Sequence, residues 1–130
     1  MLAPLVSLAV TTMCSAPVAI ELNVFSGLPN PTWYLSQSQC VELEQQIDKL
    51  PEIAKESLPP PPGLGYRGVV VHYVNQQGVR ESIGFYRGTV RSQRLRLQDP
   101  NRFLEKWLLN IGQNFVDSNM QRYLQTELSQ

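Results

Sequence analysis

His72 is the single histidine of the chain, and it lies in a run of valines that predicts a β-strand. An imidazole next to a carboxylate can act as a general base, so His72 with Glu21 or Glu81 is a candidate for hydrolase or transferase chemistry. A histidine between Val70 and Val74 is also typical of a packed strand residue. Metal sites need several ligands close together, and a second histidine is missing. We therefore predict no metal site and no cofactor, and we keep catalysis through His72 as an alternative function.

Sequence motifs with known chemistry are missing elsewhere. No phosphate-binding lysine loop, nucleophile elbow or zinc-protease helix occurs. The run from Gly63 to Gly68 matches Gly-x-Gly-x-x-Gly, but it precedes a predicted strand and does not join a strand to a helix. This context excludes the dinucleotide-binding interpretation. The pattern favours a binding protein over an enzyme.

The positive charge of the chain is concentrated in one segment. The whole chain balances 11 Lys+Arg against 11 Asp+Glu, which gives no general attraction for nucleic acid or membranes. Between residues 67 and 102, however, every base is arginine, and the net charge is +5: Arg67, Arg80, Arg87, Arg91, Arg94, Arg96 and Arg102 against Glu81 and Asp99. Arginine forms planar, bidentate contacts that lysine does not. Weak binding of a polyanion or nucleic acid through this segment is a second alternative, although ordinary solvation also explains surface charge.

A second candidate binding feature is the loop from Ser26 to Trp33, in which Pro29 and Pro31 restrict the backbone. A preformed loop loses little conformational entropy when it binds a ligand. Trp33 is either a ligand contact or a plug at the end of the core. Together, the loop and the arginine- and aromatic-rich hairpin predict a ligand-binding set that comprises Asn30, Trp33, Arg67, His72, Tyr86, Arg87 and Arg91.

The elements that position these residues follow from hydrophobic periodicity. Alternation over 18–25 predicts a strand, Ser36 with Gln39 has capping-box spacing, and two β-rich runs around 75–78 predict a hairpin. A helix is predicted after Asp99, with an interruption at Gly112. We predict an α+β fold, with an antiparallel three- to four-stranded sheet and two helices on one face in the order β-α-β-β-(β)-α. The apolar stripe of the last helix is expected to face the core and consists of Phe103, Trp107, Ile111 and Phe115, with Leu104 and Leu108 adjoining it.

The first residues are predicted to be a signal peptide or an apolar arm. Residues 1–19 form this segment and 20–130 a single domain; cleavage is expected after Ala16 or Ala19. The apolar run is too short to span a bilayer. If it is removed, Cys40 is alone; if it is retained, Cys14 and Cys40 can form one disulfide. The sequence thus predicts a small secreted or extracytoplasmic module, without a transmembrane segment, that binds a protein or a glycan. A nucleic-acid partner is not favoured, and the sequence does not determine the oligomeric state.

Overall fold

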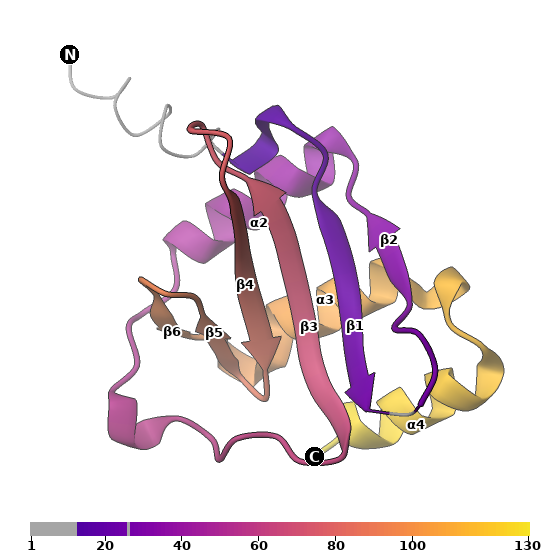
Figure 1. The fold of residues 1–130 in the computed structure, drawn as a ribbon. Coiled ribbons are helices and arrows are strands. Elements are labelled where there is room, and N and C mark those ends of the chain that lie inside the picture. The colour runs from indigo at the N-terminus through magenta and orange to yellow at the C-terminus, as the bar shows by residue number, and fades with distance from the viewer. Residues whose placement is uncertain (1–12, 26) are drawn as a thin grey trace.

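The computed structural model describes residues 13–25 and 27–130, and it confirms the α+β class. A six-stranded antiparallel sheet is covered on one side by helices, and its other side faces the viewer in Figure 1. We call the uncovered side the open face. The sheet order is β2-β1-β3-β4-β5-β6. The strands are β1 (Ala19–Phe25), β2 (Thr32–Tyr34), β3 (Gly65–Val74), β4 (Arg80–Tyr86), β5 (Thr89–Arg91) and β6 (Arg96–Gln98).

Three α-helices complete the fold: α2 (Gln37–Asp48), α3 (Phe103–Ile111) and α4 (Ser118–Leu128). The capping box of Ser36 and Gln39 is present at the start of α2. Asp99 accepts hydrogen bonds from the amides of Leu104 and Glu105 in the first turn of α3. The helix itself begins at Phe103 with Arg102 as its N-cap, three residues later than the predicted start at Pro100. The sheet therefore has more strands than expected, and the predicted C-terminal helix is two helices that separate after Gly112.

Strand β1 determines which side of the sheet becomes the core. Its Ile20, Leu22 and Val24 are buried, as the alternation predicts. The proline-containing loop then turns back on the same strand, so that β2 pairs with β1 and Trp33 lies opposite Ile20. Trp33 is 2% exposed and belongs to the core. Its burial favours the plug function over ligand contact.

The second half of the sheet contains a turn that the sequence did not predict. The long second arm of the hairpin is broken at Arg87 and Gly88, whose φ values are 48° and 86°. Two consecutive left-handed residues between β4 and β5 are the geometry of a type I′ hairpin turn. Gly88 is therefore a turn residue, and Arg87 is removed from the face of the strand.

The predicted core stripe of the last helix is confirmed in part: Trp107 and Ile111 are partly buried and pack against the core, but Phe103 and Phe115 are mostly exposed. Phe103 is 57% exposed and Phe115 60%, while Trp107 is only partly buried. The neighbouring stripe of Leu104 and Leu108 faces the sheet instead and is almost fully buried. Both stripes have helical spacing, so periodicity did not distinguish them. Asn101 and Arg102, which precede α3, have left-handed φ values of 57° and 56° and thereby influence the direction in which the helix begins.

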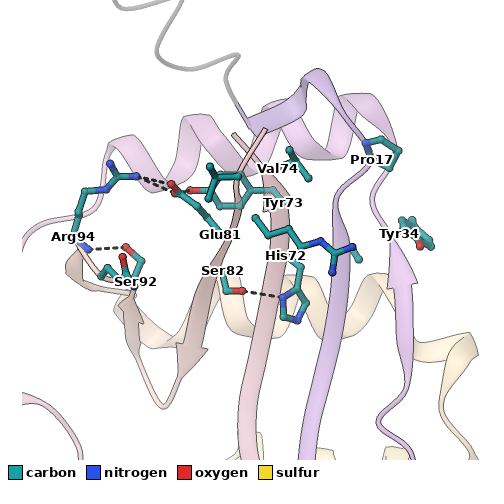
Figure 2. Close-up of a pocket in the computed structure, with 13 residues that line it drawn as sticks. Pro17, Tyr34, His72, Tyr73, Val74, Glu81, Ser82, Ser92 and Arg94 are labelled. Atoms are coloured by element: carbon teal, nitrogen blue, oxygen red, sulfur yellow. Dashed lines mark hydrogen bonds and ion pairs between the residues drawn. The ribbon is translucent and has the colours of Figure 1, made fainter. Parts of the chain in front are cut away.

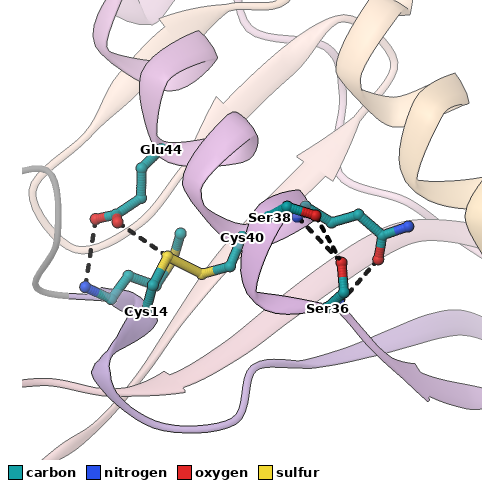
Figure 3. The surroundings of a disulfide bond; sticks show 7 residues. Cys14, Ser36, Ser38, Cys40 and Glu44 are labelled. Carbon is teal, nitrogen blue, oxygen red and sulfur yellow. Dashed lines mark hydrogen bonds between the residues drawn. A yellow bond between two sulfur atoms is a disulfide. The ribbon is translucent and has the colours of Figure 1, made fainter.

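The N-terminal part of the described chain is fastened to α2 by a disulfide between Cys14 and Cys40 (Figure 3). The amide of Met13 donates a hydrogen bond to Glu44, whose Oε1 lies 3.0 Å from the sulfur of Cys14. Burial raises the pKa of the Glu44 carboxyl. Met13, Cys14 and Val18 are all buried, so residues 13–19 are packed against the rest of the domain. Residues 1–12, which hold most of the predicted signal peptide, lie outside the described residues.

Within the described part of the chain, no helix has the length and apolar character needed to cross a membrane.

Candidate binding face

The open face is defined by the register of the sheet. Directly opposite residues of an antiparallel pair point to the same side, so one row of side chains can be followed across the strands. One row runs through Tyr34, Ala19, His72 and Ser82. The next row runs through Thr32, Glu21, Val70, Gly84, Arg91 and Arg96. These rows bring residues from six strands onto one surface.

A continuous line of hydrogen bonds crosses this surface. His72 Nδ1 lies 2.9 Å from Ser82 Oγ, and His72 Nε2 lies 2.8 Å from Glu21 Oε1. The amide of Asn30 donates to Glu21 Oε2 over 2.6 Å, and Asn30 Oδ1 accepts from the amide of Val24. We call Ser82, His72, Glu21 and Asn30 the His72 line. The hydrogen bonds from Asn30 and His72 lower the pKa of Glu21, so this carboxyl is a carboxylate near neutral pH.

Four arginines on or next to the open face are exposed, and their side chains make no hydrogen bond or ion pair with any described residue: Arg67, Arg80, Arg91 and Arg96. Arg91 and Arg96 lie directly opposite each other on neighbouring strands. Like charges placed opposite each other in a sheet repel, and an anion between them would relieve that repulsion. Among the described strand residues that the register places on this face, Glu21 is the single acid, and it is already paired with His72.

A hollow of about 820 Å³ lies beside the His72 line (Figure 2). Its lining includes apolar or aromatic side chains from Pro17, Tyr34 and Val79. Its polar lining includes His72, Arg80 and Ser82 and, away from His72, the ion pair of Glu81 with Arg94. Concave sites with apolar walls and a few polar groups are typical of small-ligand pockets.

Tyr86 and Arg87, which also belong to the predicted ligand set, contact other parts of the protein. Tyr86 is half-buried and stacks on Tyr66 with ring centroids 6.0 Å apart. The guanidinium of Arg87 lies 5.2 Å from the centre of the Tyr86 ring and donates to both oxygens of Glu127 on α4. The structure thus brings Asn30, His72 and Arg91 together on the open face, with Arg67 on or next to it. Tyr86 has the same facing on β4 but is half-buried against Tyr66, Trp33 is in the core, and Arg87 is paired with α4.

Arg87 belongs to a buried group of charges that holds the helices to the sheet. Glu105 is fully buried and accepts two hydrogen bonds from Arg102 and one from the hydroxyl of Tyr66. Arg102 also donates to the backbone oxygen of Glu127 over 2.9 Å. We call Arg87, Arg102, Glu105, Glu127 and Tyr66 the Glu105 network. Its donors and acceptors are satisfied within the protein, so it indicates a structural function.

Glu81 is separated from His72 although the two occupy paired strands. It follows Arg80 and precedes Ser82, so its side chain points to the opposite side of the sheet from theirs. There it accepts hydrogen bonds from Tyr73 and Asn75 and pairs with Arg94. Burial and the hydrogen bond to Glu81 raise the pKa of Tyr73 to about 12. A carboxylate pair of Glu21 with Glu81 is therefore not formed.

The described residues offer one compact group of possible metal ligands, which consists of Cys14, Cys40 and Glu44. The two sulfurs are joined in the disulfide. Metal binding by cysteine requires the thiolate, so this group does not have the required donors in its oxidised form.

Comparison with known proteins gives this face no assigned function. No protein-family model matches the chain, and searches of curated proteins and of solved structures returned no match. The function must therefore be argued from the geometry.

The predicted ligand set lacked four residues of the open face: Tyr34, Arg80, Ser82 and Arg96. Their position depends on the register of β4 and on the pairing of β2 with β1. The alternation of β3 and β4 was visible in the sequence, but a shift of one residue in the turn moves every side chain of β4 to the other face.

Proposed function

We propose that this protein is a small binding module that captures an acidic partner, a protein surface or a glycan, on the open face of its sheet. The observation that carries the proposal is the set of four exposed arginines without a partner among the described residues, on or next to the sheet side that the helices leave uncovered. Arginine is enriched at binding hot spots and forms bidentate contacts with carboxylates and sulfates.

The neighbouring residues support the same proposal. Tyr34 is 69% exposed on the open face and offers an aromatic surface beside the His72 line. The central Gly84 has no side chain, so the row between Val70 and Arg91 is recessed. A recess with arginines on one side suits an extended acidic segment better than a flat protein surface.

The test uses two acidic probes, a poly-glutamate peptide and heparin, with affinity measured by calorimetry at several salt concentrations. The double variant Arg91→Gln and Arg96→Gln should bind at least one probe about tenfold more weakly, which corresponds to roughly 1.4 kcal/mol. The control is Arg94→Gln, which removes an exposed arginine that already pairs with Glu81. It should leave the affinity nearly unchanged.

The outcome of this comparison decides between the proposal and its alternative. A second double variant, in which two arginines outside the open face are replaced by glutamine, removes the same amount of charge. If both double variants lose the same affinity, the binding is unspecific polyanion binding. Absence of binding of either probe at low salt, or an unchanged affinity of the double variant, would contradict the proposal. Poly-glutamate and heparin also separate a protein partner from a glycan partner.

A further inference from the structure

The His72 line has the composition and order of a nucleophilic catalytic triad. Ser82 Oγ contacts one ring nitrogen of His72, and Glu21 contacts the other. In such an arrangement the imidazole accepts the proton of the hydroxyl, while the carboxylate holds the ring in one tautomer and stabilises its positive charge. Here the carboxylate requires the proton on Nε2, which leaves Nδ1 free to accept the proton from Ser82.

The register of the sheet gives this arrangement its rigidity. Ser82 lies directly opposite His72 on the paired strand, and Glu21 lies two residues along β1 from the residue opposite His72. All three side chains extend from strands at the centre of the sheet, and Asn30 fixes the second oxygen of Glu21. The acid therefore has little freedom to leave the imidazole.

Access for a substrate is provided by the hollow beside the line. Ser82 and His72 both line it, as do the apolar side chains of Pro17 and Val79 and the ring of Tyr34 (Figure 2). Arg80 lies two residues before Ser82 on β4 and therefore on the same face. The backbone amides of the central strands point within the sheet plane toward their ladder partners, so a side chain must stabilise an oxyanion above the face. Arg80 lines the same hollow and, unlike Arg94, has no ion-pair partner among the described residues, so it is the cation assigned to this task.

We propose that Ser82, His72 and Glu21 form a catalytic site that hydrolyses small carboxylic esters. Ser82 is the nucleophile, His72 the general base, and Glu21 and Asn30 are positioning residues. The reaction needs no reactant other than the ester and water, and it extends beyond the binding function proposed for the arginines.

The reaction passes through an acyl-serine intermediate. The Ser82 oxygen forms a bond to the carbonyl carbon while its proton moves to His72 Nδ1. The carbon–oxygen bond of the ester then breaks, and the leaving alkoxide takes the proton from His72. Water, deprotonated by His72, attacks the acyl-serine, and the acid is released as Ser82 regains a proton.

A fluorophosphonate probe tests the nucleophile without a known substrate. The Ser82 oxygen should displace fluoride and form a phosphonylated protein, visible as one mass addition that maps to Ser82. Ser82→Ala should abolish the adduct, and His72→Ala should slow its formation about a hundredfold, within the range for general base catalysis. The matched control is Ser38→Ala, because Ser38 is exposed on α2 and distant in sequence and fold from the line.

Two further measurements separate catalysis from a structural polar contact. The wild-type labelling rate should depend on pH, because a base must accept the Ser82 proton, and this dependence should disappear in His72→Ala. Glu21→Gln should reduce the rate about tenfold and alter the same pH profile, whereas a merely structural Glu21 would change stability alone. Circular dichroism of each variant confirms that the fold is retained.

A thiol variant provides an independent readout. Both native cysteines are joined in the disulfide, so Ser82→Cys introduces one free thiol. Its alkylation by iodoacetamide should be faster with His72 present than in the Ser82→Cys, His72→Ala double variant. No adduct on Ser82, or equal labelling rates with and without His72, would overturn the proposal.

Discussion

The Glu105 network and the His72 line contain similar groups, acids paired with cationic or imidazole side chains, in different surroundings. Glu105 is fully buried and Glu127 is 5% exposed, and both are held by arginines that cannot lose their charge. In the His72 line, the side chains of His72 and Glu21 are 44% and 29% exposed. The buried group connects β3, the β4–β5 turn, α3 and α4, whereas the other group is presented to solvent. Acids of the first kind hold the helices to the sheet, and acids of the second kind remain accessible to solvent.

The largest expected effect comes from the substitution Glu105→Gln. It leaves the buried guanidinium of Arg102 without its bidentate partner, and breaking a buried pair in this way costs about 3–5 kcal/mol. The same substitution at Glu21 on the open face should change the free energy of unfolding by less than about 1 kcal/mol at pH 7. Urea unfolding of both variants measures the contrast. Equal losses would show that burial does not separate the two groups.

Two glycines provide the next comparison. A Cβ on Gly112 would lie 2.1 Å from a ring carbon of Trp33, while a Cβ on Gly84 would meet nothing closer than the Arg91 oxygen at 3.9 Å. Because a buried indole has little room to move, Gly112→Ala should destabilise the protein by about 1–3 kcal/mol. Gly84→Ala should be neutral or slightly stabilising, since glycine weakens a strand. Thermal unfolding checks both variants, and a tolerated alanine at 112 would contradict the close packing of Trp33.

The smallest effect is a pH dependence in the His72 line. The pKa of Glu21 is lowered from 4.5 in the folded protein by the hydrogen bonds from Asn30 and His72. A lowered pKa stabilises the fold above the pKa of the unfolded chain, and this stabilisation is lost as the pH falls through the folded pKa.

The corresponding experiment compares wild-type protein with Glu21→Gln. The wild-type advantage should be complete above about pH 4.5 and should shrink as the pH is lowered toward 3. Its size should stay below about 1 kcal/mol, because the pair is partly screened by solvent. Urea midpoints at pH 5.5, 4.5 and 3.5 measure it. A difference that grows toward low pH would contradict the assigned direction.

Local sequence patterns predicted the elements but not their pairing. The alternation of β1, the capping box of α2 and the break at Gly112 were all confirmed. These signals depend on residues within a few positions of each other, so one strand or helix suffices to reveal them.

The hairpin between β3 and β4 shows where local reasoning ends. A turn of residues 75–78 would place His72 opposite Glu81, but Val74 pairs with Arg80, and His72 therefore lies opposite Ser82. The longer turn is held by Asn75, whose side-chain oxygen accepts hydrogen bonds from the amides of Gln77 and Val79. One additional turn residue thus determined which side chain contacts the histidine.

The Glu105 network was missed for a different reason. Arg102 and Glu127 are 25 residues apart, and Arg87 and Glu127 are 40 apart. Charged residues in a sequence are expected to be solvated, and nothing local marks these as buried. The αL conformation of Arg102 and the turn at Arg87 bring them together, and both depend on tertiary packing.

The Cys14–Cys40 disulfide has a consequence for maturation. If oxidation precedes cleavage, a cut after Ala16 would sever the backbone yet release nothing, because the clipped peptide would stay attached to α2 through sulfur. Detachment would then require a reductant as well as a protease. If the predicted cleavage takes place, its order relative to oxidation would decide whether the domain retains the apolar side chain of Met13 in its interior.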